Sequence, residues 1–410
     1  MPSPKHARVV LLMLLSVAGT GRAGADGDDR YAGLDALIAR EPGHIGAIHH
    51  AARTAANAGD GDRAVAYLRA LENHGFDDAL EPADFASLAG RDDYRKIARR
   101  LDAASVMGAP ALHAETDCLE VLPEGAAYDA ARGRFLMSSG HRRNVIAVDA
   151  DGHCSEVVPP GNGDLLAVLG MGVDAARDTL WVASAAAPFM RDAAAAKPGE
   201  TRLSRIDLSS GRVMASYAPA VPGLLNDLDL LPDGRIAVTD SIAGTVYLLD
   251  PSEASPGLRP LLPAGSFEGP NGIVARADGQ LLVADFHALW LVDASSPAPA
   301  RKRRITTPGG RYLGGMDGLA RDGDHIVAIQ NLVGRGRVWR FRVDATTAHV
   351  DDLQLLLRQH PDLRNPTTGV VADRRFLFVA DPNLQVFADD ALSAALAGRR
   401  GHRILALPLP

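Results

Sequence analysis

Six short runs repeat along this chain at intervals of 45 to 55 residues, and each leads through a turn into a segment rich in β-forming residues. The leading residues of the six runs are Glu124, Met171, Asn226, Asn271, Asp317 and Thr368. A period of this size carried by strands is typical of a β-propeller, in which each repeat makes one four-stranded blade. The sequence therefore predicts a mainly β chain with a six-bladed β-propeller, whose leading residues form a ring around the central channel.

The second strand of each repeat is the most distinct, because each is a short apolar run preceded by turn residues. These runs span residues 134–137, 179–182, 235–238, 280–283, 325–328 and 376–379. The longest interval between leading residues, from Met171 to Asn226, falls where blade 2 carries an Ala- and Pro-rich insertion from Ala185 to Glu200. Insertions in propellers lie in loops on one face, so we expect this one to be either a lid or a surface loop without a role.

Residues 26–108 have a different character, with many Ala, Arg, Asp and Leu residues and few β-branched ones. Small and apolar residues recur at helical spacing from Ile45 to Ala55 and from Ala64 to Leu71, with a Gly-Asp turn between them. This helical hairpin resembles one tetratricopeptide unit. One such unit cannot bury both of its faces, so we expect the segment to pack on the propeller or on a protein partner.

A Gly/Pro/Ala linker from Met107 to Ala114 separates this small α-helical domain from the propeller, which is predicted to cover residues 115–410. The net charge of −7 and the isoelectric point near 6.0 argue against a nucleic-acid partner.

Residues 1–25 have the pattern of a secretory signal peptide. A basic start at Lys5 to Arg8 precedes a short apolar core, and Ala23-Gly24-Ala25 has the small-residue pattern of a cleavage site. The apolar core is too short to span a bilayer, although an N-terminal anchor is the alternative. We therefore expect a periplasmic or secreted protein with no membrane span after the signal is cleaved.

The two cysteines, Cys118 and Cys154, flank the first repeat. An exported protein permits a disulfide, and the strands of blade 1 lie between the two positions. The sequence leaves open whether they are bonded. Without a Cys-x-x-Cys pair or nearby histidines, a zinc site is not expected.

Four runs occur in order at blade spacing: Leu122-Pro123-Glu124-Gly125, Asn226-Asp227, Gly269-Pro270-Asn271-Gly272-Ile273 and Met316-Asp317-Gly318-Leu319. With these runs, the chain resembles the SMP-30/gluconolactonase/LRE-like family of six-bladed propellers. The resemblance implies a divalent cation in the channel, held by Glu124, Asn271 and Asp317, with Asn226 near the metal and able to touch substrate or water.

The chemistry of these side chains agrees with a metal site. Two carboxylates and one or two amide oxygens make a hard, oxygen-only ligand set, which suits Ca²⁺ best and Mg²⁺ or Mn²⁺ next. The alternative is that the same residues are only turn formers at the start of each blade. Blade 3 lacks the family's usual Asn-Asp-Gly, and the ring positions in blades 2 and 6 are Met171 and Thr368. Sugar-lactone specificity therefore does not follow from the resemblance.

Two functions are compatible with this ring. The first is a Ca²⁺-dependent lactonase or esterase-type hydrolase, in which Asp317 or Glu124 accepts a proton from water. The second is a non-catalytic propeller that binds a protein or small ligand, with the helical segment as an adaptor. Polar residues expected near the channel mouth are His141 and His287, as candidate contacts to a lactone or ester substrate, and Asp240 and Asp285. The sequence contains neither a Gly-x-Ser-x-Gly elbow nor a nucleotide-binding loop.

Overall fold

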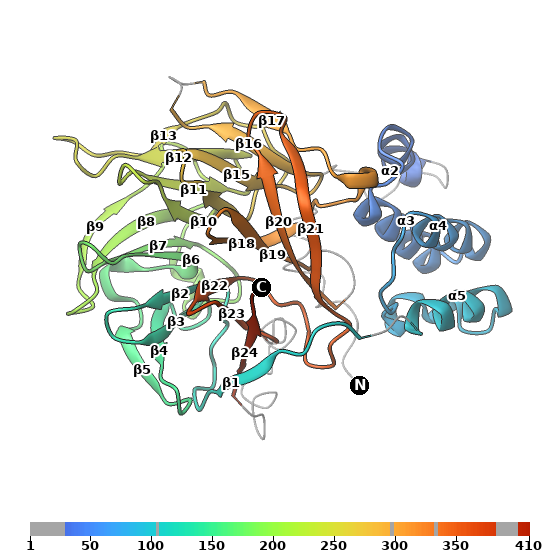
Figure 1. Ribbon diagram of the computed structural model, residues 1–410, viewed down its shortest axis with the longest axis horizontal. Helices are drawn as coiled ribbons and strands as arrows, with labels where there is room; N and C mark the ends of the chain where they lie inside the picture. Colours follow the sequence, from blue (N-terminus) through green and yellow to red (C-terminus); the bar gives the residue numbers. More distant parts are fainter. Residues whose placement is uncertain (1–28, 104–105, 296–298, 332–334, 383–400) are drawn as a thin grey trace.

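The computed structural model describes residues 29–103, 106–295, 299–331, 335–382 and 401–410. Its strands form six four-stranded antiparallel sheets, so the six-bladed β-propeller with a small N-terminal helical segment is confirmed (Figure 1). The predicted signal peptide lies outside the described residues. Among the described helices, none is both long and apolar enough to cross a membrane.

The blades follow one another along the chain. Blade 1 contains β2 (Ala126–Asp129), β3 (Arg134–Ser139), β4 (Asn144–Val148) and β5 (Cys154–Val158). Blade 2 contains β6 (Ala167–Asp174), β7 (Thr179–Ala185), β8 (Thr201–Asp207) and β9 (Val213–Tyr217). Blade 3 contains β10 (Leu225–Leu230), β11 (Ile236–Asp240), β12 (Thr245–Leu249) and β13 (Arg259–Pro260).

The next two blades have the same order. Blade 4 contains β14 (Ile273–Ala275), β15 (Gln280–Ala284), β16 (Leu289–Asp293) and β17 (Lys302–Arg304). Blade 5 contains β18 (Met316–Asp322), β19 (His325–Gln330), β20 (Arg337–Asp344) and β21 (His349–Arg358).

Blade 6 closes the propeller with strands from both ends of the chain. It contains β22 (Gly369–Ala372), β23 (Arg375–Val379) and β24 (Arg403–Pro408), and its outer strand is β1 (Ala111–Glu115). β1 runs antiparallel to β24, with Ala111 opposite Ala406. The linker predicted from Met107 to Ala114 is therefore wrong in part, because its second half is a strand of the propeller.

The apolar core of the propeller is divided into layers between blades. Within the described residues, six buried clusters each draw their side chains from two neighbouring blades, and a smaller one lies between blade 2 and its insertion. The apolar runs predicted as second strands supply much of each cluster, because a blade packed on both faces needs a continuous apolar run. Each blade is therefore held mainly by the sheets on either side of it.

The inner strands lie unusually close together around the channel, which explains the glycine that follows several leading residues. A Cβ added at Gly125 would lie 2.0 Å from the carbonyl oxygen of Leu169 in the next blade. A Cβ at Gly318 would lie 2.7 Å from the Cα of Thr368. Only glycine tolerates such an approach of one backbone to another.

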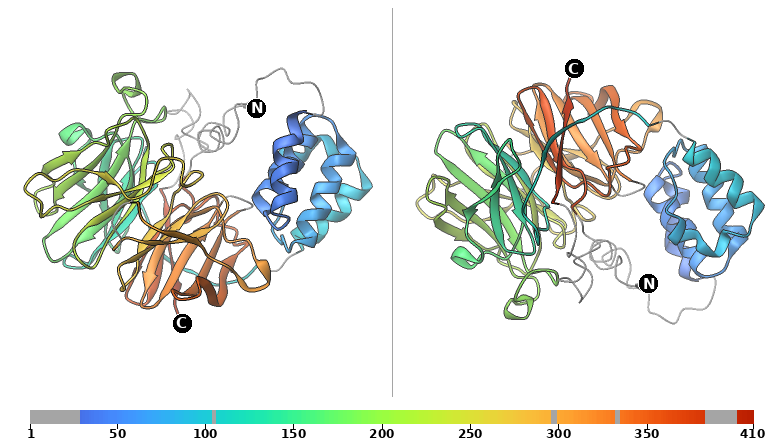
Figure 2. Two further views of the ribbon diagram at one scale, coloured as in Figure 1. Left: turned by 90° about the horizontal axis from the view of Figure 1, so that it is seen from above. Right: turned by 90° about the horizontal axis from the view of Figure 1, so that it is seen from below.

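The helical segment contains α2 (Asp29–Arg40), α3 (Ile45–Asn57), α4 (Gly61–Asn73), the 3₁₀ segment η1 (Pro82–Leu88) and α5 (Asp92–Asp102). Asp60 caps α4 by accepting a hydrogen bond from the backbone of Arg63, as the predicted Gly-Asp turn requires. The helices share their own buried cluster, against which Tyr312 of the propeller packs. Both views of Figure 2 place this segment beside blades 4 and 5.

A disulfide joins Cys118 to Cys154, with 5.7 Å between their Cα atoms. Cys118 lies in the connection from β1 to β2, and Cys154 begins the outer strand β5. The bond therefore ties the strand connection beside the closing blade to the outer edge of blade 1.

Candidate metal centre

The register of the first two strands in each blade identifies the ring position. In blade 3, Leu225 pairs with Asp240 and Leu228 with Val238, so Asn226 and Asp227 lie in an irregular step between them. Blade 2 has the same step between Val168 and Met171. The residue equivalent to Asn226 is therefore Leu169, and the prediction that Met171 belongs to the ring is wrong.

Met171 instead lies in the buried cluster between blades 1 and 2. The close approach of Gly125 to the carbonyl of Leu169 repeats the approach of Gly170 to the carbonyl of Asn226, which supports the same alignment. The ring is consequently apolar at blade 2, through Leu169 rather than Met171.

Asp317 is the best-connected carboxylate of the ring. It is 7% exposed, and its two oxygens accept hydrogen bonds from the side-chain amides of Asn271 and Asn331. Burial raises the pKa of Asp317 to about 6, while the two amide hydrogen bonds oppose that rise. The structure therefore brings together two of the predicted metal ligands, Asp317 and Asn271, on adjacent blades.

Glu124 faces the same channel from blade 1. Its backbone is fixed on both sides, because its carbonyl accepts hydrogen bonds from the hydroxyls of Thr367 (2.9 Å) and Thr368 (2.8 Å), and its N–H donates to Ser138. Burial, followed by the negative charges of Asp317 and Asp227, raises the pKa of Glu124 well above its ordinary value. The hydroxyl of the ring residue Thr368 is thus used to hold Glu124 in place.

Asp227 is a third buried carboxylate of this region, and it joins blade 3 to blade 4. Its oxygens accept hydrogen bonds from the N–H groups of Leu228 (2.9 Å) and Ile273 (3.2 Å). Burial raises its pKa despite these bonds, and the negative charges of Asp229 and Asp317 raise it further. Asp227 therefore positions the strand that begins two residues after Asn271.

Asn226 is held by a short hydrogen-bonded chain. Its side-chain amide donates to the hydroxyl of Ser241 at 3.0 Å, and Ser241 donates to the carbonyl of Pro270 at 2.7 Å. Thr239 donates to the carbonyl of Asn271 at 2.9 Å. The side chains of blade 3 thus support the Pro270-Asn271 segment of blade 4 from two points.

These residues fit a divalent cation by their chemistry. Burial raises the pKa values of Glu124, Asp227 and Asp317, and the charge of Asp317 raises those of Glu124 and Asp227 further. Within the described residues, no arginine or lysine forms an ion pair with any of the three carboxylates. Buried carboxylates are usually paired with a cation or protonated. A hard cation held by Glu124, Asn271 and Asp317 would supply the missing positive charge.

The four polar residues expected at the channel mouth have identifiable roles. Asp240 accepts hydrogen bonds from Leu224, Ile242 and Ala243, and Asp285 accepts them from His287 and Ala288, so both shape the loop after the second strand.

The two histidines lie in equivalent loops of different blades. The Nδ1 atom of His141 lies 2.6 Å from the carbonyl of Phe189, which belongs to the blade 2 insertion. His287 contacts His44 of the helical segment. A contact of either histidine with substrate stays a prediction.

Two contributors to the ring were not found from the sequence. Asn331 follows β19 directly, at the position equivalent to Ser241 in blade 3. Both residues hydrogen-bond to a ring side chain of their own blade. A search for polar residues immediately after each second strand would have found Asn331, whereas Asp227 was visible only as part of an Asn-Asp pair.

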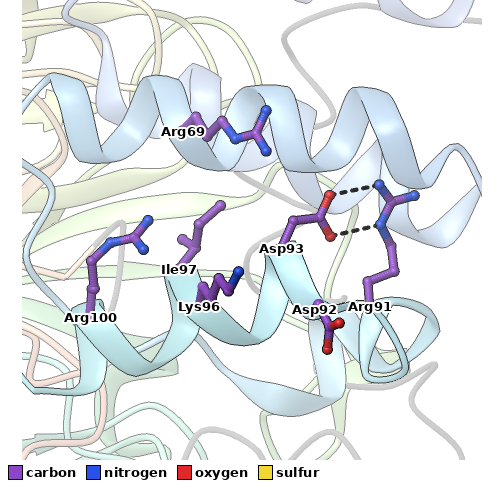
Figure 3. Close-up of a pocket in the computed structure, with 7 residues that line it drawn as sticks. All are labelled: Arg69, Arg91, Asp92, Asp93, Lys96, Ile97 and Arg100. Carbon is purple, nitrogen blue, oxygen red and sulfur yellow. Dashed lines mark hydrogen bonds and ion pairs between the residues drawn. The ribbon is translucent and has the colours of Figure 1, made fainter.

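Two other charged features lie outside the channel. Asp149, Asp151 and His153 bring their ligand atoms within 4.8 Å of one another, but they are exposed, and Asp149 already accepts two backbone hydrogen bonds of its turn. A groove of about 520 Å³ on the helical segment is lined by Arg69, Arg91, Asp92, Asp93, Lys96, Ile97 and Arg100 (Figure 3). Arg91 pairs with Asp93 of the same lining, and Arg100 pairs with Glu72 outside it, so part of the positive charge of the groove is neutralised.

No protein-family model matches the sequence. No curated protein sequence matches it either. Similar solved structures include a gluconolactonase from Xanthomonas campestris at 18% identity, covering 75% of this chain and 92% of that one, with a TM-score of 0.49. They also include a luciferin-regenerating enzyme (14% identity, 73% and 96% covered, TM-score 0.48) and a virginiamycin B lyase from Staphylococcus aureus (13%, 72% and 98%, 0.44). Likenesses this distant carry no argument about activity.

Proposed function

We propose that this protein is a Ca²⁺-dependent hydrolase of the lactonase or esterase type, with its reaction centre at the ring. The observation that carries the proposal is the convergence of the half-buried carboxylate of Glu124 and the buried carboxylates of Asp227 and Asp317. The amide of Asn271 joins them, and none of the three carboxylates has an ion-pair partner in the described chain. A hard cation satisfies this donor set better than any protein group present.

The ion would be held by Glu124, Asn271 and Asp317, and when bound it would polarise a lactone or ester carbonyl and acidify a water molecule. Asp317 or Glu124 accepts the proton of the attacking water, because burial raises the pKa values of both carboxyls and makes them stronger bases. Asn226 orients the substrate or the water through its amide, and Leu169 supplies the apolar side of the channel.

We also propose that the protein is exported to the periplasm or the exterior. The signal-like segment at residues 1–25 motivates this proposal. The disulfide between Cys118 and Cys154 supports it, since such bonds persist in oxidising compartments.

Metal analysis of the purified protein, followed by a panel of lactones and esters, tests the hydrolase. We expect about one Ca²⁺ per chain, and hydrolysis that chelation abolishes and Ca²⁺ restores. Asn271→Ala and Asp317→Asn should each lose ion and activity, whereas Asp151→Asn, an exposed carboxylate outside the channel, should keep both. A wild-type protein that takes up no divalent ion, or variants that hydrolyse at the wild-type rate, would overturn the proposal.

The competing function is a non-catalytic binding propeller with the helical segment as an adaptor for a protein partner. An ion-loaded protein that turns over no member of the panel and co-purifies with a stoichiometric partner would favour it.

A further inference from the structure

The helical segment meets the propeller on the face where the ring lies. Its contacts fall on the loop after β15, on the end of β17, on the segment that leads into β18 and just before β20. In an antiparallel blade, the end of the second strand is next to the beginning of the first. These contacts are therefore at the same edge of blades 4 and 5 as Asn271 and Asp317.

The contact between His44 and His287 determines which ring nitrogen carries the proton in each neutral histidine. The backbone N–H of Ala47 donates to Nδ1 of His44 at 3.1 Å, so a neutral His44 carries its proton on Nε2. That Nε2 lies 2.7 Å from Nδ1 of His287, which must accept. His287 therefore carries its own proton on Nε2, and this atom lies 2.5 Å from the carboxylate of Glu268.

This chain holds only while both histidines are neutral. A second proton on His287 would place an N–H against the N–H of His44. A second proton on His44 would remove the acceptor that caps α3, because Nδ1 could no longer accept from Ala47. Protonation of His287 thus breaks the hydrogen bond between the two parts, and protonation of His44 breaks the cap of α3 that holds the His44 ring in place.

We propose that His44, His287 and Tyr312 form an acid-sensitive latch, through which the docked helical segment orders the ring-side loops of blades 4 and 5. The ordering of the ring by this latch rests on the proposed metal site, whereas the docking itself does not.

Tyr312 connects the latch to the ring. Its ring centroid lies 4.7 Å from that of His44, and its hydroxyl donates to the carbonyl of Phe286. The Phe286 ring lies against Gly269, two residues before Asn271. A docked α3 is therefore connected, through Tyr312 and Phe286, to the segment that positions Asn271.

The loop that begins at Tyr312 also supports Asp317. Gln330 donates to the carbonyl of Gly314 at 2.8 Å, just ahead of β18, and Asn331 beside it donates to Asp317. The loop from Tyr312 to Gly315 thus lies between the latch and the second metal ligand.

The charges around the pair act in both directions, because Glu41 raises the pKa of His44 while Arg304 and His287 lower it, and burial is the largest cause. The groups that face the two histidines are Glu41, Glu268, Asp285, Arg304 and Tyr312. Burial, followed by the neighbouring His287, lowers the pKa of His44 to about 4. A histidine with a lowered pKa stabilises docking fully above its ordinary value near 6.5, and this contribution is lost as the pH falls toward 4. At pH 5 the docking equilibrium should be about 30-fold weaker than at pH 7.5.

The second patch of the interface has a different chemistry and should act as the pivot. Asp77 pairs with Arg337 and Arg358, and Gln359 donates to the carbonyl of Asp77 at 3.1 Å. We therefore expect the α3 end to swing away in acid while this end stays in contact.

The test uses the full chain in three variants. His44→Asn keeps an oxygen that can cap α3 but cannot reach His287. His287→Asn keeps an acceptor near the Nδ1 position but cannot be protonated. His74→Asn makes the same substitution at an exposed histidine of the same segment and is the control.

Four measurements are made on each variant. Nitrogen NMR of labelled histidine reports the tautomers of His44 and His287, and spin labels at Arg40 and Ile242, both exposed, report the distance between the parts. Ca²⁺ affinity at pH 7.5 reports the ring. Circular dichroism verifies that the helices persist at pH 5, since His49 and His50 also have pKa values lowered by burial.

We expect one narrow distance at pH 7.5 in the wild type, the Nε2–H tautomer on both histidines, and a broad distribution at pH 5. His287→Asn should shift this release to lower pH, and His44→Asn should show it already at pH 7.5, with about tenfold weaker Ca²⁺ binding. A wild type that stays docked at pH 5 with helices intact would overturn the latch. Unchanged Ca²⁺ affinity in an undocked His44→Asn would overturn the ordering of the ring. A wild type that binds no Ca²⁺ would overturn the metal site and with it the ordering of the ring. In that case the spin-label distance and the histidine tautomers still test whether the helical segment docks through the latch.

Discussion

Replacing Asp317 by Asn should make the metal-free protein more stable while removing its ability to bind the ion. Asp317 is buried, and burial raises its pKa from 3.8 to about 6. A carboxyl with a raised pKa takes up a proton on folding, so its favourable contribution is complete below about pH 3.8 and is lost as the pH rises through about 6. At neutral pH the folded chain therefore contains a charge that opposes folding.

The magnitude follows from this shift. At pH 7.5 the buried charge costs about 3 kcal/mol, since each pKa unit corresponds to about 1.4 kcal/mol. An amide at this position would lose one of the hydrogen bonds from Asn271 and Asn331, which costs about 1 kcal/mol. The net gain is about 2 kcal/mol, or roughly 4 °C in the melting temperature of a domain of this size.

Thermal unfolding in EDTA at pH 7.5 and 4.5 measures the effect. At pH 4.5 the charge costs only about 1 kcal/mol, so the gain should vanish there. Saturating Ca²⁺ should reverse the order of the two proteins, because the ion stabilises only the chain that binds it. Asp151→Asn, at an exposed turn, should melt with the wild type in all conditions.

Two results would refute this reasoning. One is an Asp317→Asn protein that melts at or below the wild type in EDTA at pH 7.5. The other is a gain of the same size at pH 4.5, because a pH-independent effect cannot come from the ionised carboxylate.

Three further changes test the scaffold around the ring. Replacing Cys118 and Cys154 by Ala opens a loop with a sequence separation of 36 residues, and should lower the free energy of unfolding by about 4 kcal/mol; a wild-type denaturation midpoint would contradict this. Gly318→Ala forces a Cβ to within 2.7 Å of Thr368 and should lower the free energy of unfolding by about 1–3 kcal/mol. Gly257→Ala, with open space around it, should be nearly neutral, and equal effects of the two substitutions would refute the role of close approach. Thr239→Val removes the hydroxyl that hydrogen-bonds to both Asp227 and Asn271, so it should lower the free energy of unfolding by about 1–3 kcal/mol and weaken Ca²⁺ binding. A stable variant with unchanged Ca²⁺ affinity would show that these bonds do not position Asn271.

The blades could be predicted because each repeats the same local signal. An apolar run bounded by turn residues predicts a strand wherever it stands, and all six second strands occur where the runs do. The closing strand β1 has no such signal, since it is short, has exposed positions and pairs only with β24 at the other end of the chain. Its place depends on a contact that no local pattern contains.

The predicted ring position in blade 2 is displaced by two residues. Leu169 and Met171 have the same parity along β6, and side chains two residues apart point to the same face of a strand. Only the irregular step between Val168 and Met171 distinguishes them, and such steps have no fixed sequence signature. Asn331 was missed for a related reason, because it reaches Asp317 from the end of the second strand and not from the repeat that defined the ring.

The pairing of β1 with β24 delays completion of the propeller while the chain is being synthesised. Ala111 leaves the ribosome among the first propeller residues, and its partner Ala406 is among the last. Pairings so distant in sequence form slowly. Until β24 arrives, blade 6 has no third or fourth strand, and the face of blade 1 that blade 6 covers remains open to water. Removal of β24 should therefore impair the whole propeller and not only its final blade, and a nascent chain would need protection from aggregation until β24 has emerged from the ribosome.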